Sequence, residues 1–109
     1  MNVHEELLEA SRSGDQTKII ELLCMGANPN HPDAQDFLEN VLIATIQGGI
    51  PNETRRENWC ILMRYGASPA STTLAGLSAH SVAIEKGLLD FYCTDEAACE
   101  CILKNVQGL

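Results

Sequence analysis

Cysteine and histidine are the residue types in this sequence that could carry nucleophilic or metal-binding chemistry. The chain has five cysteines and three histidines: Cys24, Cys60, Cys93, Cys99, Cys101, His4, His31 and His80. A thiol beside an imidazole can act as a nucleophile. Cys24, Cys60 and Cys101 fall within apolar stripes at helical spacing, where a thiol usually packs as a small hydrophobic group. We therefore predict that the chain is not an enzyme and has no catalytic residues, with a thiol-dependent enzyme as an alternative.

A metal site is the second chemistry that these residues could support. Cys93, Cys99 and Cys101 together with His80 would supply four soft ligands. Cys99 and Cys101, however, lie two positions apart in a predicted helix, so their side chains face nearly opposite directions. The paired Cys-x-x-Cys spacing of zinc sites does not occur in the sequence. We predict neither a metal nor a cofactor.

The charge of the chain limits the classes of partner. Its 109 residues include 7 basic and 15 acidic side chains, which gives a formal net charge of −8 with neutral histidines. Nucleic acids and anionic membranes bind basic surfaces. The basic doublet of the chain, Arg55-Arg56, is flanked by Glu53 and Glu57. We therefore predict no nucleic-acid partner and no membrane partner, and we expect a basic protein as the binding partner.

The N-terminal segment and the cysteine spacing bear on the cellular compartment. The first twenty residues carry four acidic side chains and lack the basic start and apolar run of a secretory signal. No apolar stretch approaches the roughly 18 residues that would cross a bilayer. An odd number of irregularly spaced cysteines suits a reducing compartment. These features predict a cytoplasmic protein, and secretion by a route that needs no signal peptide stays open.

A repeated Ala-x-x-x-Gly pattern organises the chain. It occurs three times, at intervals of 34 and 39 residues: Ala10 and Gly14, Ala44 and Gly48, Ala83 and Gly87. Each copy lies in a stretch with helical apolar spacing, and a second helical pattern follows each glycine. Two of the second patterns end in Gly26-Ala27-Asn28-Pro29-Asn30 and Gly66-Ala67-Ser68-Pro69-Ala70. There the glycine allows the left-handed backbone that ends a helix, and the proline prevents the helix from resuming.

This unit of helix, turn, helix, Gly-Ala stop and loop resembles the ankyrin repeat, which is 33 residues long. The interval from Gly14 to Gly26 is twelve residues, that from Gly66 to Gly76 is ten, and that from Gly76 to Gly87 is eleven. All three are intervals of the ankyrin family. The resemblance spans about residues 5 to 90. It implies an all-α fold, an ankyrin-like helix-turn-helix repeat solenoid with hairpin-like loops. Residues 1–109 would form a single domain, with repeats at about 1–33, 34–72 and 73–109.

The sequence departs from the ankyrin pattern in several places. The Thr-Pro-Leu-His start is missing, and His80 fills a slot that is usually leucine, so we expect a partly buried imidazole there. The interval from Gly48 to Gly66 is eighteen residues, six longer than expected. Residues 50–58 are therefore predicted to form a polar loop or an extra helical turn. A third unit has a similar insert at 88–97, and its end lacks the Gly-Ala stop, so self-association through the C-terminal end stays open.

The resemblance also implies a set of partner-binding positions, because ankyrin-like stacks contact partners through loop tips and the exposed part of each first helix. On the helices these positions are Arg12, Ser13, Ile46, Gln47, Glu85 and Lys86. On the loops they are Gln35, Asp36, Leu38, Leu74, Ala75 and Leu77. Ile46 and the three leucines would form an apolar strip on the groove side, and exposed apolar strips often mark interaction sites. Packing between the loops is the alternative role for the leucines.

The sequence thus predicts a non-catalytic protein-protein interaction module that acts as an inhibitor or adaptor. It would bind a partner protein through a concave groove and loop tips. A rigid groove loses little conformational entropy on binding. Acidic residues at its rim, such as Asp33 and Asp36, would speed association with a basic partner. A secreted microbial effector that mimics a host scaffold is the alternative from another class.

Overall fold

The computed structural model describes residues 2–47 and 51–86. Five α-helices lie in this part of the chain: α1 (Val3–Ser13), α2 (Gln16–Cys24), α3 (Val41–Gln47), α4 (Asn52–Arg64) and α5 (Ala79–Glu85), with a 3-10 turn, η1 (Pro32–Ala34). The same residues contain no β-strand, so the predicted all-α class is confirmed for them. None of these five helices has the length and apolar character needed to cross a membrane. The predicted insert at 88–97, the cysteines Cys93, Cys99 and Cys101, and the C-terminal end lie outside the described residues.

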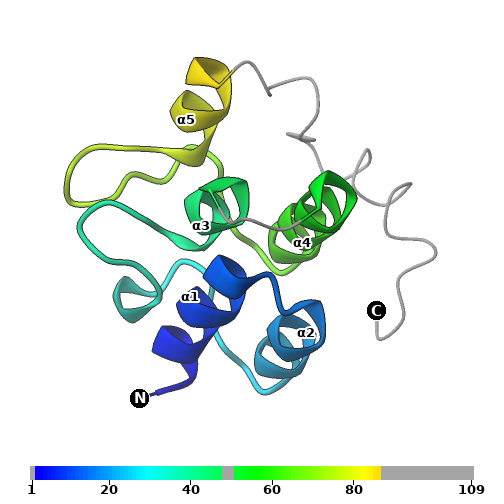
Figure 1. Cartoon of the computed structure of the whole chain (residues 1–109). Helices are drawn as coiled ribbons and strands as arrows, with labels where there is room; N and C mark the ends of the chain where they lie inside the picture. The colour runs from blue at the N-terminus through cyan, green and yellow to red at the C-terminus, as the bar shows by residue number, and fades with distance from the viewer. Residues whose placement is uncertain (1, 48–50, 87–109) are drawn as a thin grey trace.

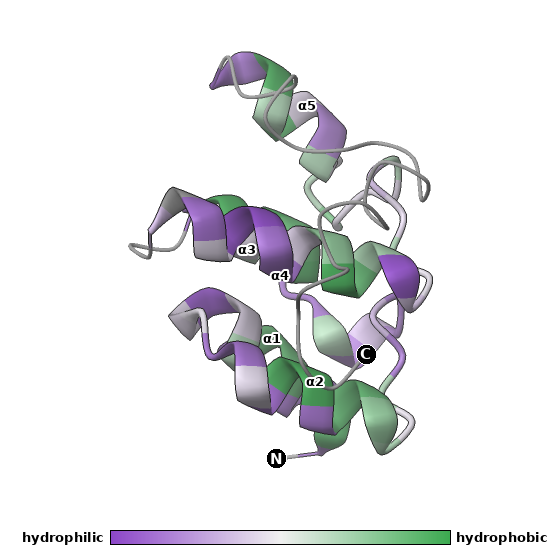
Figure 2. Cartoon of the chain, turned by 90° about the vertical axis from the view of Figure 1, so that its right-hand side faces the viewer, coloured by the Kyte–Doolittle hydropathy of each residue, from purple (hydrophilic) through white to green (hydrophobic). Residues whose placement is uncertain are grey.

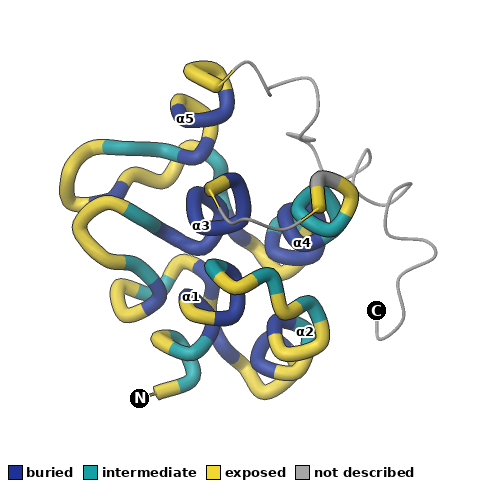
Figure 3. The backbone as a smooth tube through the Cα atoms, in the orientation of Figure 1, coloured by how far each residue is buried: buried dark blue, intermediate teal, exposed yellow. Residues whose placement is uncertain are grey.

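The helices are arranged in layers. α1 packs against α2, and α3 packs against α4. The first pair lies against the second, since α1 contacts α3 and α2 contacts α4, and α5 packs on the far side of α3 (Figures 1 and 2). The buried segments, dark blue in Figure 3, lie where the helices pack against one another. Leu7, Ile19, Leu22, Ile43 and Leu62 are among the most deeply buried.

Short polar side chains cap the N-terminal ends of three of the helices, α1, α2 and α5. The Asn2 side-chain oxygen accepts hydrogen bonds from the backbone N–H groups of His4 and Glu5, both at 3.0 Å. Asp15 accepts one from Lys18 at 3.2 Å at the start of α2. Ser78 accepts one from the backbone of Ser81 at 3.1 Å at the start of α5. These contacts satisfy donors that the first turn of a helix leaves without a partner.

The two predicted Gly-Ala stops end α2 and α4 in the same way. Gly26 and Gly66 have backbone φ angles of +99° and +101°, a region that side chains disfavour. In both cases the N–H of the residue after the glycine donates a hydrogen bond back to a carbonyl of the preceding helix. Ala27 donates to Leu22 and Ala67 donates to Leu62, each at 3.0 Å. This prediction is confirmed, and the two halves of the described chain share a turn geometry as well as a motif.

The enlarged interval between the paired helices is helical from residue 52 onward. α4 begins at Asn52 and continues to Arg64, so residues 52–58 belong to its first turns. Of the two predicted forms, the extra helical turn is confirmed for these residues and the polar loop is wrong. The added turns lead directly into Trp59 and Cys60, which are buried. The extension therefore lengthens α4 without moving its apolar residues out of the core.

Candidate functional site

Two hairpin-like loops project beside α3, and we call them finger 1 (residues 35–40) and finger 2 (residues 72–78). An isolated bridge between Gln35 and Asn40 closes finger 1, and one between Thr72 and Ser78 closes finger 2. The Ala75 N–H donates to the Phe37 carbonyl at 3.1 Å. Because this bond joins one finger to the other, the two loops form one surface, seen side by side in Figure 1.

An open groove of about 710 Å³ lies along this surface, and we call it the finger groove. Its described lining residues are Asp36, Phe37, Leu38, Glu39, Gln47 and Leu77. Phe37 and Leu38 are 62% and 57% exposed, and Leu74 on finger 2 is 80% exposed. Three large apolar side chains on two linked loops are an unusual use of solvent-facing positions, and such clusters often mark interaction sites.

The structure brings part of the predicted partner-binding set together. Asp36, Leu38, Gln47 and Leu77 line the finger groove. Leu74 and Ala75 are exposed on finger 2, and Gln35 is half-buried at the base of finger 1. Ser13, Glu85 and Lys86 are exposed on α1 and at the end of α5, and they do not line the groove. Leu77 lines the groove and also packs against the core, rather than only between the loops.

Ile46 is a predicted partner contact that the structure contradicts. Its exposed fraction is 1%, and the whole run from residue 41 to residue 46 is buried. The physical reason is the position of α3, which packs against α1, α4 and α5 and therefore has little free surface before its last residue. Ile46 belongs to the core, and the apolar part of the groove comes from the fingers.

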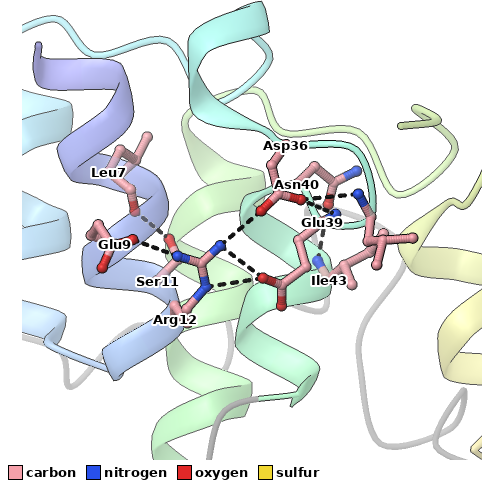
Figure 4. A network of polar contacts seen from close by, with 9 residues as sticks. Leu7, Glu9, Ser11, Arg12, Asp36, Glu39, Asn40 and Ile43 are labelled. Atoms are coloured by element: carbon pink, nitrogen blue, oxygen red, sulfur yellow. Dashed lines mark hydrogen bonds and ion pairs between the residues drawn. The ribbon is translucent and has the colours of Figure 1, made fainter. Parts of the chain in front are cut away.

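Arg12, another predicted partner contact, is half-buried and makes ion pairs within the chain. Its guanidinium lies among three carboxylates (Figure 4). It pairs with Glu9 on its own helix, with Asp36 at 3.1 Å and with Glu39 at 2.8 Å. Burial works to lower the pKa of Arg12, but the hydrogen bond and charge of Glu39, with the charges of Glu9 and Asp36, outweigh it and raise that pKa. Arg12 is thus an internal counter-ion that ties α1 to finger 1.

We expect the change Arg12→Met to lower the free energy of unfolding by about 1 kcal/mol. The change leaves three carboxylates close together without their cation. Lys18→Met is the matched control, because Lys18 is an exposed cation on α2 with no ion pair among the described residues. Urea unfolding in low and high salt measures both effects, and salt should narrow the gap between wild type and Arg12→Met. Equal effects of the two changes would show that the cluster does not hold finger 1.

No family model, curated protein or solved structure matches the chain. The ankyrin resemblance therefore stays a prediction, and the function has to be argued from the geometry.

The described cysteines differ in burial, and one of them contradicts the prediction. Cys60 is buried in the core as expected. Cys24, which the apolar stripe of α2 also placed in the core, is exposed at the end of that helix, with its sulfur 3.7 Å from the Tyr65 hydroxyl. The stripe of α2 turns Ile19, Leu22 and Leu23 inward, and the next position faces away because successive helical residues are rotated by about 100°. Periodicity over so short a helix does not fix the burial of its last residue.

Burial raises the pKa of the Cys60 thiol from its ordinary value of 9.0 to about 12, with nearby Arg56 opposing and Glu57 adding to the rise. A thiolate is the reactive form of cysteine, so Cys60 is a poor nucleophile at neutral pH. The raised pKa also has a consequence for stability. Between pH 9 and about 12 the unfolded chain loses this proton while the folded chain keeps it, so the Cys60 contribution to the free energy of unfolding falls as pH rises.

The measurement is urea unfolding as a function of pH for wild type and Cys60→Ala. Other groups titrate in the same range, so the quantity of interest is the difference between the two proteins. We expect the stability of wild type to fall more steeply than that of Cys60→Ala between pH 9 and about 12. Parallel profiles would contradict the burial of this thiol.

The histidines also lie differently from the prediction. His80 is exposed on α5 rather than partly buried, because α5 packs on α3 and its N-terminal turn leaves this position in solvent. The His4 and His31 rings stack, with centroids 3.8 Å apart and planes within 2°. The sequence separation of these two rings hides the stack from pattern analysis. Across residues 2–47 and 51–86, no three histidine, cysteine or acidic side chains gather in a way that could hold a metal ion.

Sequence reasoning missed Phe37 and Glu39, which complete the groove lining. Phe37 stands between two predicted positions, Asp36 and Leu38. A signal for it was present, since an aromatic residue in a polar loop has no helical stripe to join. Glu39 gave no such signal, because its role depends on Arg12, which is distant in sequence but lies 2.8 Å away.

Proposed function

We propose that this chain is an ankyrin-like helix-repeat module that binds another protein through the finger groove and has no catalytic role. The repeat interpretation is supported by the matching turns after α2 and α4, which share positive-φ glycines and the same return hydrogen bond. The two fingers add a further likeness, since each is a loop closed by one antiparallel bridge and followed by a helix.

The observation that carries the binding proposal is the exposure of Phe37, Leu38 and Leu74 on two loops joined by a backbone hydrogen bond. Leaving such side chains in water forgoes the free energy of their burial, on the order of 1.5–3 kcal/mol each. A partner that covers them recovers part of it. Because the loops are already held by bridges and by the Arg12 cluster, little ordering is needed on binding.

Binding without catalysis fits the role of an inhibitor or an adaptor. In both roles the module covers or presents a surface of its partner and needs no reacting group. The Cys60 thiol supports this proposal, since it is buried with a raised pKa and is therefore a poor nucleophile at neutral pH. An acidic chain with a formal charge of −8 would associate faster with a basic partner than with a neutral one.

A displayed library of random peptides, selected on the immobilised protein, tests the groove. The enriched peptides are then titrated against wild type, Phe37→Ser and Met25→Ser. Met25 is the matched control, because it is also a large exposed apolar residue but lies at the end of α2. We expect Phe37→Ser to weaken binding about tenfold or more and Met25→Ser to leave it nearly unchanged. Peptides that ignore Phe37, or that depend equally on Met25, would refute the proposal.

A further inference from the structure

Three carboxylates surround a single guanidinium beside the finger groove. Glu9, Asp36 and Glu39 all pair with Arg12, so the cluster has a formal charge of −2. Two of these carboxylates, those of Asp36 and Glu39, also line the groove together with Phe37 and Leu38. None of the described lining residues is lysine or arginine. The groove therefore combines an apolar surface with unbalanced negative charge.

The two groove carboxylates, those of Asp36 and Glu39, differ in how many of their oxygens accept hydrogen bonds. One oxygen of Asp36 accepts the backbone N–H groups of Leu38 and Glu39 at 3.0 and 2.7 Å, and its other oxygen accepts from Arg12 at 3.1 Å. Asp36 is thus fully engaged in shaping finger 1. Glu39 accepts the hydrogen bond from Arg12 at its Oε1 atom alone, which lies 2.9 Å from the Arg12 Nε atom. Its Oε2 atom accepts no hydrogen bond from the described part of the chain, and Glu39 is one of the residues that line the groove.

We propose that the finger groove binds a segment of the partner protein in which an arginine lies next to an apolar side chain. The arginine would donate to Glu39, and the apolar side chain would rest on Phe37 and Leu38. This inference depends on the proposed function, because it names the chemistry that the same groove recognises. A carboxylate with a free oxygen suits a guanidinium, whose planar donors form strong charge-assisted hydrogen bonds. The exposed Phe37 ring beside it adds a surface on which a guanidinium can stack.

The apolar neighbours strengthen this preference for a cation. Charges interact more strongly where water is excluded, and a partner seated on Phe37 and Leu38 would exclude water from the Glu39 carboxylate. A neutral segment would cover the Glu39 carboxylate without donating to its Oε2 atom, which costs binding free energy. A segment that ends in an acidic side chain would add repulsion to that cost. The groove thus discriminates against neutral and acidic partners as well as favouring basic ones.

The test uses the peptides that depend on Phe37. We expect them to be enriched in arginine beside an apolar residue. Replacing that arginine with glutamine, or changing Glu39→Gln in the protein, should weaken binding about tenfold. Glu9→Gln is the matched control, since Glu9 also pairs with Arg12 and carries the same charge but does not line the groove. It should weaken binding far less.

Three results would overturn the inference in distinguishable ways. Peptides that depend on Phe37 but carry no arginine preference would refute the cation site and leave the proposed function standing. Equal losses for Glu9→Gln and Glu39→Gln would assign the effect to overall charge rather than to the groove. Selection that yields no Phe37-dependent peptide would refute the proposed function itself, and the arginine site with it. Circular dichroism of each variant establishes that the helices are retained.

Discussion

Replacing Ile46 with alanine is expected to lower the free energy of unfolding by about 2–5 kcal/mol. Ile46 is 1% exposed near the end of α3, where neighbouring helices leave no space for water. Truncation removes buried carbons and leaves a cavity that the surrounding side chains fill only in part. A loss of this size is a large fraction of the roughly 5–15 kcal/mol that stabilises an ordinary domain. The variant therefore distinguishes a core position from the groove position that the ankyrin register predicts.

Ile84→Ala is the matched control for this prediction. It makes the same chemical change on another short helix, α5, but Ile84 is 53% exposed. We expect a loss of about 0.5 kcal/mol or less. Urea unfolding followed by circular dichroism measures both variants. If Ile46→Ala cost no more than Ile84→Ala, Ile46 would face solvent, and the apolar strip of the groove would have to include it.

Trp59→Ala is expected to have an effect at least as large, about 3–5 kcal/mol. Trp59 is one of the largest fully buried side chains and the single tryptophan of the chain. It follows directly on the added turns of α4, so its burial shows that the helical extension keeps the apolar stripe of α4 in register with the core. Trp59→Phe retains most of the apolar volume and should cost less than Trp59→Ala.

Two measurements check the Trp59 prediction. Unfolding of the variants by urea gives the free-energy losses, with Tyr65→Ala as a control on the same chain segment, because Tyr65 is exposed just after α4. Fluorescence of the wild type gives an independent reading, since a buried indole emits at shorter wavelength than an exposed one and should shift to longer wavelength on unfolding. A native spectrum like that of free tryptophan would contradict the packing of α4.

The helix ends were the most predictable part of the fold. Gly26 and Gly66 each require a backbone conformation that glycine adopts without strain, so a single residue type marks the end of the helix. The added turns before Trp59 could be narrowed only to two forms. Polar residues with charged neighbours suit an exposed loop and a solvated helix face equally well, and the structure decides for the helix.

The groove was predictable only in part, because exposure depends on neighbours that are distant in sequence. Asp36 and Leu38 followed from the register of the loop, and both line the groove. The register also placed Ile46 in the groove, but the helices packed around α3 bury it. The register assigned Arg12 to a partner contact. Its ion pairs with Asp36 and Glu39 could not be predicted, because they join two elements that no local pattern links. Side-chain contacts of this kind appear once the chain has folded.

Mapping the bound state by NMR would show whether the finger groove is the protein-binding surface that we propose. Amide chemical shifts of the protein would be recorded with and without a selected peptide that depends on Phe37. We predict that the largest changes fall on Phe37, Leu38, Gln47 and Leu77, which line the groove. Largest changes around Met25 and Tyr65, the exposed apolar residues at the ends of α2 and α4, would contradict the claim and move the binding surface to the opposite ends of the helices.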